Sequence, residues 1–205
     1  MKGGVNIKQW KEMLSGHLPG REAQRQMAPD YRGEADPSAY PVPAAVLILL
    51  YPSGERTGLV FIKRNEYDGP HSAQVSFPGG AWEKGDGSLA NTAVREAREE
   101  LGVDGEIVLL GQMTDLDIPV SNFRVTPFVA HTPERPVFRP DPSEVQYVIE
   151  STVEALLDPS ARQTETWDFR EMQVDVPFYE VNGEKIWGAT AMMLCEFLQL
   201  AISVV

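Results

Sequence analysis

The stretch REAREELG, from Arg95 to Gly102, ends the clearest helical pattern in the chain. The helix is expected to begin near Ser88, a good N-cap residue, and to stop at Gly102, since glycine adopts the left-handed conformation that ends many helices. At about 100° per residue, one stripe of this helix is apolar and the neighbouring stripe carries three carboxylates, those of Glu96, Glu99 and Glu100. Like charges at this spacing repel, so the stripe is either a solvated surface or a set of metal ligands.

A double glycine upstream favours the metal site. Gly79 and Gly80 follow a strand-like run that ends at Phe77, and glycines there allow backbone atoms to approach a ligand closely. Carboxylates opposite such a turn suit Mg²⁺ or Mn²⁺, which prefer oxygen ligands. The alternating Asp and Asn ligands of a calcium loop and the GK[ST] of a phosphate loop are both missing from the sequence.

The charge balance constrains the ligand. The chain has 205 residues, with 18 Lys plus Arg against 30 Asp plus Glu, which gives a formal net charge of −12. A phosphate backbone attracts clustered lysine and arginine, so no nucleic-acid partner is expected. If the ligand is itself an anion, divalent cations have to mediate the contact.

Cysteine, histidine and apolar runs exclude other classes. The single cysteine, Cys195, rules out a disulfide within the chain and a cysteine-based zinc cluster, and the three histidines lack ligand spacing. The N-terminus has no apolar stretch typical of a secretory signal. The longest apolar run, Ala44 to Tyr51, fits a buried strand and is too short to span a membrane. We therefore expect a cytoplasmic protein without a membrane partner.

The remaining patterns predict a mixed α/β fold, with one sheet between helices. Strands are expected at 44–51 and 57–64 (a hairpin), 73–77, 106–112, 123–131, 144–150, and 174–188 (a hairpin around Asn182–Gly183). Further helices are expected at 5–15, at 151–159 with Ser151 and Glu154 as a capping box, and at 189–205, a buried closing helix. Residues 16–43 are rich in Gly, Pro and Asp and predict an extended arm. Residues 1–40 are thus expected to pack as a helix and arm on a domain formed by 41–205.

The pattern GG…REAREELGV resembles the box of the Nudix hydrolase superfamily, G-x5-E-x7-REUxEExGU, where U is apolar. Residues 95–103 match the second half of the box throughout. The first half departs, because the expected glutamate falls at Gly87 and Gly80 lies one residue too far upstream. Glu83 and Asp86 are nearby acids out of register, so neither is assigned that role. The resemblance implies a Nudix-type α/β/α sandwich with a mixed sheet.

The stretch VFIKRNEYDGPHSAQVSFPGG, residues 60–80, resembles the additional signature of Nudix enzymes that hydrolyse coenzyme A, LLTxR-x4-R-x3-G-x3-FPGG. Arg64 and the run Phe77–Gly80 match, whereas Gly69 and Ala73 replace the second arginine and the isolated glycine. The resemblance implies a metal-dependent pyrophosphatase that cuts coenzyme A or acyl-CoA into 4′-phosphopantetheine (or its acyl form) and adenosine 3′,5′-bisphosphate. Alternatives are a Nudix hydrolase of ADP-ribose, NADH or a dinucleoside polyphosphate, and a Nudix-fold binding module without catalysis.

The resemblance also implies roles for individual residues. Mg²⁺ or Mn²⁺ would be held by three box glutamates and one backbone carbonyl, those of Glu96, Glu99, Glu100 and Gly79. Arg95 would orient the glutamates. The general base would be Glu99 or Glu100 acting through a bound water, with Glu144, which precedes a strand, as the reserve candidate.

Contacts to the substrate phosphates are expected from basic or polar side chains, those of Lys63, Arg64, His71 and Arg124. The expected partner is a small-molecule diphosphate, and a homodimer is compatible with the sequence.

Overall fold

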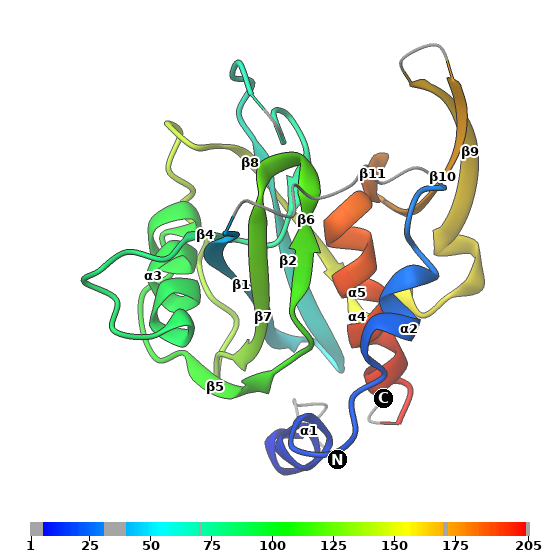
Figure 1. Cartoon of the computed structure of the whole chain (residues 1–205). Helices are drawn as coiled ribbons and strands as arrows, with labels where there is room; N and C mark the ends of the chain where they lie inside the picture. Colours follow the sequence, from blue (N-terminus) through cyan, green and yellow to red (C-terminus); the bar gives the residue numbers. More distant parts are fainter. Residues whose placement is uncertain (1–5, 31–39, 70, 170–171, 204–205) are drawn as a thin grey trace.

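An eight-stranded mixed sheet lies at the centre of the computed structural model, which describes residues 6–30, 40–69, 71–169 and 172–203 (Figure 1). Its strands are β1 Val42–Ser53, β2 Arg56–Arg64, β3 Val75–Ser76, β4 Gly79–Ala81, β5 Val108–Gln112, β6 Leu116–Ile118, β7 Phe123–His131 and β8 Val145–Thr152. The helices are α1 Ile7–Leu14, α2 Gly20–Arg25, α3 Leu89–Leu101, α4 Val153–Leu156 and α5 Gly188–Ala201, with short 3₁₀ turns η1 Pro119–Ser121 and η2 Pro159–Ala161.

Strand β1 is the centre of this sheet. The strand order is β3-β2-β1-β7-β5, while β4 pairs with β1, β6 with β7 and β8 with β2. Strands β1 and β7 run parallel, with Ala44 opposite Val125, and the other pairs are antiparallel. A strand covered on both faces reads as a continuous apolar run, which is why residues 44–51 stood out in the sequence.

Helices cover both faces of the sheet, which confirms the predicted α/β fold with a mixed sheet between helices. Alternate residues of β1 point to opposite faces, so Leu47 and Leu49 pack with Ala97 of α3, whereas Ile48 and Leu50 belong to the core beneath α5. Figure 1 shows α3 on one side of the sheet and α5, α4 and α2 on the other. Among the helices that the structure describes, none is long and apolar enough to cross a membrane.

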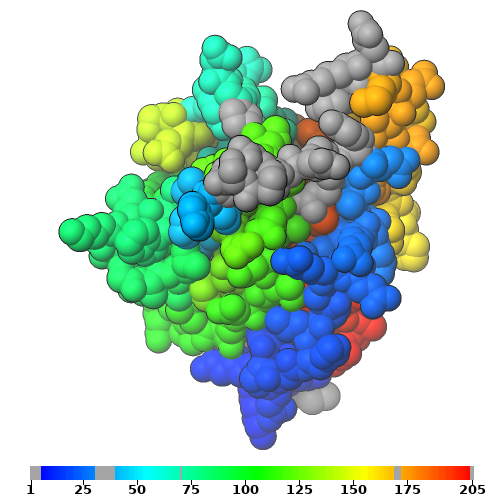
Figure 2. Space-filling view, in the orientation of Figure 1, coloured from blue at the N-terminus to red at the C-terminus, as the bar shows by residue number. Residues whose placement is uncertain are grey.

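The N-terminal segment lies against the last helix. The ring of Trp10 in α1 stacks on Phe197 of α5 at 5.1 Å between centroids. Within the arm expected at 16–43, residues 20–25 instead form helix α2, which packs on α5. The fully buried carboxylate of Glu196 accepts hydrogen bonds from the Gly20 N–H and the Gln24 amide, so a tertiary contact fixes this short helix. Figure 2 shows these N-terminal helices beside the C-terminal segment at the surface.

A second sheet corrects the prediction of a single one. Strands β9 Arg162–Phe169, β10 Met172–Val181 and β11 Glu184–Trp187 form it in the order β11-β10-β9. The hairpin of β10 and β11 was predicted, whereas β9 was not, because most of its described residues are exposed and lack an apolar alternation. The predicted capping box at 151–154 is also wrong: β8 continues to Thr152, whose side chain caps α4 at Ala155 N, while Glu154 accepts from Thr57 N.

Candidate active site

Helix α3 carries the candidate site, and both of its ends match the prediction. The Ser88 side chain accepts a hydrogen bond from Asn91 N, and Gly102 ends the helix in the left-handed conformation with φ of 60°. A Cβ atom at Gly102 would lie 2.2 Å from the carbonyl oxygen of Arg139, so both the backbone conformation and the close approach require glycine. The helix is thereby fixed in register against the loop that leads to Glu144.

Glu100 is the innermost carboxylate, with a side chain only 1% exposed. Its Oε2 accepts a hydrogen bond of 2.7 Å from Gly79 N, and its Oε1 lies 3.2 Å from the guanidinium of Arg64. Burial raises the pKa of Glu100 to about 7, opposed by the charge of Arg64 and the Gly79 N–H and reinforced by the nearby Glu96 and Glu144. The helix therefore places a buried carboxylate, whose charge Arg64 only partly balances, against the double-glycine turn.

Glu96 and Glu144 complete a group of three carboxylates. One oxygen from each of Glu96, Glu100 and Glu144 lies within 4.8 Å of the others. A Cβ atom at Gly80 would come within 2.4 Å of the Glu96 carboxylate, so glycine leaves the room that this side chain occupies. Burial raises the pKa of Glu96 as well, and the charges of Glu99 and Glu144 add to the rise while Arg95 opposes it. We call Glu96, Glu100 and Glu144 the acidic group.

Arg95 holds the outer side of this helix together. Its guanidinium donates to Glu96 at 2.9 Å and to Glu99 at 2.8 Å, and it also donates to the Ala81 carbonyl. Glu99 is 54% exposed and lies outside the acidic group, so its predicted role as ligand or base stays a prediction. These contacts place Arg95 beside two of the glutamates, and its orienting role stays a prediction.

Asp86 is the residue that sequence reasoning missed. Its carboxylate accepts from Arg95 at 2.7 and 3.1 Å, and also from Glu83 N and the Thr92 hydroxyl. The Arg95 guanidinium is the largest cause that holds the pKa of Asp86 well below its usual range. In the sequence Asp86 was set aside for being one residue out of register with the box. The longer loop after Gly80 brings Asp86 to Arg95. An arginine inside an acidic motif needs a carboxylate partner, and this need is the signal that could have identified Asp86.

Arg64 and Lys63 illustrate why adjacent residues of a strand do not share a site. Arg64 donates to the Gly79 carbonyl at 2.7 Å and to the Ser76 hydroxyl at 3.1 Å, besides its contact with Glu100. Successive side chains of β2 point to opposite faces, and Lys63 forms a 2.8 Å ion pair with Glu184 instead. The structure therefore brings Arg64 to the acidic group and places Lys63 away from it.

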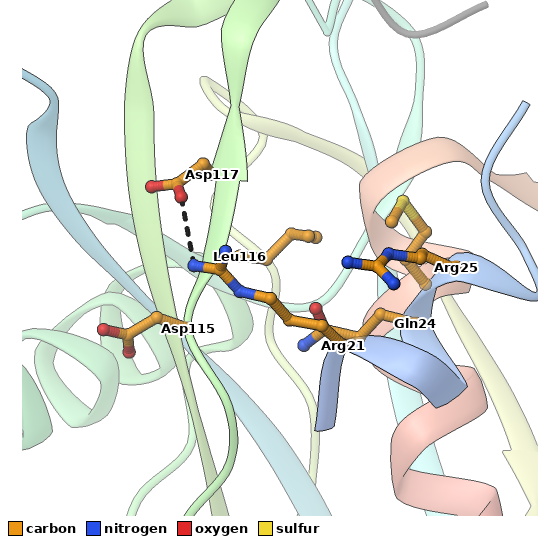
Figure 3. Close-up of a pocket in the computed structure, with 7 residues that line it drawn as sticks. Arg21, Gln24, Arg25, Asp115, Leu116 and Asp117 are labelled. Carbon is orange, nitrogen blue, oxygen red and sulfur yellow. Dashed lines mark hydrogen bonds and ion pairs between the residues drawn. The ribbon is translucent and has the colours of Figure 1, made fainter. Parts of the chain in front are cut away.

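Arg124 is engaged outside the acidic group, by Asp117. Asp117 lines a cavity of about 200 Å³ between α2 and β6 (Figure 3). Asp117 at the rim of this cavity pairs with Arg124 at 2.7 Å and with Arg21 at 3.4 Å. The neighbouring Asp115 accepts from the Thr126 hydroxyl. Arg124 is thus paired with Asp117, which does not belong to the acidic group, so the predicted phosphate contact of Arg124 finds no support in its position.

His71 lines a different cavity, of about 290 Å³, which adjoins the acidic group and which we call the side cavity. Its ring nitrogens lie 3.1 Å from Gln74 Oε1 and 2.9 Å from Ser121 Oγ. Arg64, Gly79 and Gly80 line the same cavity, so it shares its edge with the residues that contact Glu100 and Glu96. The structure thus brings His71 and Arg64 together at this edge.

The donor set fits a divalent cation of the hard class. Three carboxylates, gathered at short range and only partly neutralised, and a backbone carbonyl at Gly79 supply the oxygen ligands that such ions prefer. The raised pKa values of Glu96 and Glu100 point the same way. Burial, reinforced by the neighbouring negative charges, favours the protonated carboxyl groups, and a bound cation would favour the ionised ones. The acidic group is therefore compatible with one or more divalent metal ions.

The chain is similar to known proteins over most of its length. Residues 41–185 match the family model described as NUDIX domain. The chain is 33% identical over 161 residues to Nudix hydrolase 22, chloroplastic, of Arabidopsis thaliana, covering 75% of this chain and 53% of that protein. It is 32% identical over 157 residues to the uncharacterized Nudix hydrolase NudL of Photorhabdus laumondii, covering 76% of this chain and 83% of that protein.

A solved structure shares the fold. The crystal structure of a MutT/nudix family protein from Enterococcus faecalis superposes with a TM-score of 0.57 at 16% identity, covering 83% of this chain and 66% of that one. The chain spans little more than half the length of several curated relatives that it matches, with 53%, 59% and 54% of three of them covered.

Proposed function

We propose a function from one premise: the chain belongs to the Nudix family. Enzymes of this family generally use divalent metal ions, and the relatives that this chain matches are named as hydrolases. We therefore propose that this protein hydrolyses the diphosphate bond of a small nucleotide derivative. The observation that carries it is the convergence of Glu96, Glu100 and Glu144 within 4.8 Å beside the Gly79–Gly80 turn.

The chain's own residues supply a cation-binding face for the diphosphate. Glu96, Glu100 and the Gly79 carbonyl would hold Mg²⁺ or Mn²⁺, and the Glu144 carboxylate would face the bound ions. When bound, these ions neutralise the phosphate charge and lower the pKa of bound water. Arg95 is not available to the substrate, because its donors are taken by Asp86, Ala81, Glu96 and Glu99, so it positions the glutamates. A protein with a formal net charge of −12 repels a diphosphate, and such cations would offset this repulsion at the site.

The contacts favour Glu144 over Glu99 as the general base. The carboxylate of Glu99 is engaged by Arg95, whereas none of the described residues forms a hydrogen bond or ion pair with the Glu144 carboxylate. Glu144 is exposed, and Asn65 N fixes its backbone by donating to its carbonyl. In the proposed step, a water oxygen attacks one phosphorus, its proton passes to Glu144, and the bridging P–O bond breaks to give two phosphomonoesters. Glu99 or Glu100 acting through a water remains the alternative.

Coenzyme A and its acyl derivatives are the substrates we propose within this class. The support is the partial signature at 60–80, in which Arg64 contacts both the Gly79 carbonyl and Glu100. At the missing glycine of that signature, Ala73 still adopts a left-handed φ of 54°, so the backbone keeps the conformation that glycine favours. The products would be 4′-phosphopantetheine, or its acyl form, and adenosine 3′,5′-bisphosphate.

A substrate panel tests this proposal. The purified protein is incubated with Mg²⁺ or Mn²⁺ and with coenzyme A, an acyl-CoA, ADP-ribose, NADH and a dinucleoside polyphosphate, and the products are identified by chromatography. We expect coenzyme A or acyl-CoA to be cut fastest. Faster cleavage of ADP-ribose or of a dinucleoside polyphosphate would overturn the coenzyme A assignment and leave a hydrolase of the same class.

Calorimetry with the metals alone provides the control for catalysis. No turnover of any substrate, together with no binding of Mg²⁺ or Mn²⁺, would overturn the enzyme proposal. Metal or nucleotide binding without turnover would instead indicate a Nudix-fold binding module. A matched variant, Ala155→Leu on the exposed side of α4, is expected to behave as the parent protein in every arm.

A further inference from the structure

The side cavity has a different chemical character from the acidic group that it adjoins. Among the described residues that line it, Arg64 is the only lysine or arginine, and there is no aspartate or glutamate. Its volume of about 290 Å³ lies at the lower end of small-molecule sites, so it fits one part of a substrate rather than the whole. A diphosphate at the acidic group would reach this cavity at the edge formed by Gly79 and Gly80.

Apolar side chains make the far wall of the side cavity. They come from elements that are distant in sequence: β6, β7 and the first turns of α5, contributing Ile118, Phe123, Val125, Ala189 and Met193. Val125 and Met193 belong to the buried core, while Ile118, Phe123 and Ala189 are partly buried against it. The rigid sheet and helix therefore hold this wall in place, which makes it a preformed surface for an apolar group.

The polar groups of the lining are largely occupied by protein partners. The His71 ring pairs with Gln74 and Ser121, and the Thr190 hydroxyl donates to the Val75 carbonyl. Arg64 is held by Gly79, Ser76 and Glu100. A ligand group with many hydroxyls would lose its water hydrogen bonds on entry and find few replacements, which costs binding free energy.

We propose that the side cavity selects diphosphates whose second substituent is an uncharged, mainly aliphatic arm, and disfavours those in which it is a second sugar. This inference rests on the proposed hydrolase function and names the substrate class of that site. Coenzyme A belongs to the first class, because its diphosphate is esterified by a branched aliphatic alcohol. ADP-ribose and dinucleoside polyphosphates belong to the second class.

Narrowing the cavity tests the proposal. In Ala189→Leu, three added carbon atoms project from the first turn of α5 into the lining, and Ala155→Leu makes the same change on the exposed side of α4. We measure kcat/KM for coenzyme A and for ADP-ribose with the full chain. We expect Ala189→Leu to lower kcat/KM for coenzyme A by about tenfold or more, a loss typical of one misplaced apolar group, and to change that for ADP-ribose less than about threefold.

Two results would overturn the inference: equal losses for both substrates, or no loss for coenzyme A in a variant that is folded by circular dichroism. If Ala189→Leu does not fold, Ile118→Phe narrows the cavity from β6 instead of α5 and carries the same expectation. Ala155→Leu is expected to match the parent protein on both substrates.

A binding measurement separates this inference from the hydrolase function. Calorimetry with 4′-phosphopantetheine and with ribose 5-phosphate as probes needs no turnover. We expect the parent protein to bind the former more tightly, and Ala189→Leu to lose that preference. If no diphosphate is cleaved and the preference is still found, the hydrolase proposal fails and the cavity inference stands. If diphosphates are cleaved and neither preference is found, the cavity inference fails alone.

Discussion

The two sides of helix α3 carry the same residue type in opposite environments. On the inner side, Glu100 is 1% and Glu96 is 13% exposed, and both face the Gly79–Gly80 turn and Glu144. On the outer side, Glu99 is 54% exposed and pairs with Arg95, which Asp86 anchors. The inner carboxylates have raised pKa values, because burial and mutual repulsion outweigh the nearby arginines. Burial, rather than residue type, distinguishes the acidic group from the ion pair on the outer side.

The largest expected effect comes from exchanging one carboxylate on each side. Glu100→Gln is expected to lower kcat by about 1,000-fold or more, because it removes a buried charge at the centre of the acidic group. The fold should persist, since the amide oxygen can still accept from Gly79 N. Glu99→Gln is expected to cost only about 10- to 100-fold, as for a residue that supports the ligands. Steady-state kinetics with Mg²⁺ compare the two, and an equal loss would place Glu99 among the metal ligands.

The anchor on the outer side is tested by Asp86→Asn. An amide keeps the size of the side chain and removes the charge that Arg95 contacts at 2.7 Å. Arg95 should then shift towards Glu96 and Glu99, and we expect turnover to fall by about 10- to 100-fold with weaker Mg²⁺ binding by calorimetry. Asp86→Glu serves as the control that restores the charge. Unchanged kinetics in Asp86→Asn would show that the contact between Asp86 and Arg95 does not position the glutamates of the acidic group.

Adding one methyl group to the turn tests the inner side without changing any charge. Gly80→Ala would place a Cβ 2.4 Å from the flexible Glu96 carboxylate, so this side chain should move at little cost in stability while Mg²⁺ affinity falls by about tenfold. In Gly79→Ala the Cβ would lie 2.3 Å from the rigid Ala45 carbonyl oxygen. Thermal unfolding should therefore separate the variants, with Gly79→Ala much the less stable. Equal stabilities would contradict the described packing of β4.

The last expected effect concerns stability rather than catalysis, and it is a pH dependence of the metal-free protein. The pKa of Glu100 is about 7 in the folded state, above its unfolded value of 4.5, so the protonated form favours folding. This contribution is complete below pH 4.5 and is lost as the pH rises through 7. The free energy of unfolding should fall over this window by up to about 3 kcal/mol more than in Glu100→Gln.

Urea unfolding of both proteins at several pH values measures the difference, and identical pH profiles would contradict the assignment. Because a cation requires the ionised carboxylate, metal binding below pH 7 should also release protons. Calorimetry in two buffers of different ionisation enthalpy detects this release, and Glu100→Gln should reduce it.

The limits of helix α3 and the central strands could be predicted because they depend on local signals. Ser88 and Gly102 bound the helix through capping and backbone conformation, and β1 is a continuous apolar run. Helix α2 and strand β9 could not be predicted in this way. The first depends on a hydrogen bond to Glu196, which lies far along the chain, and the second is exposed and gains its order by pairing with β10.

The sequence by itself indicated the type of chemistry: the glutamates of one helix stripe, an arginine beside them and a double glycine at the end of a strand favour a site for cations with oxygen ligands. Tertiary structure decided which carboxylates meet. Glu99 faces outwards, Glu144 joins the acidic group from the loop before β8, and Asp86 contacts Arg95. Tertiary structure also separated Lys63 from Arg64 and built the side cavity. The reason is physical: residue type sets which interactions a side chain can make, whereas burial and distance are properties of the packed chain.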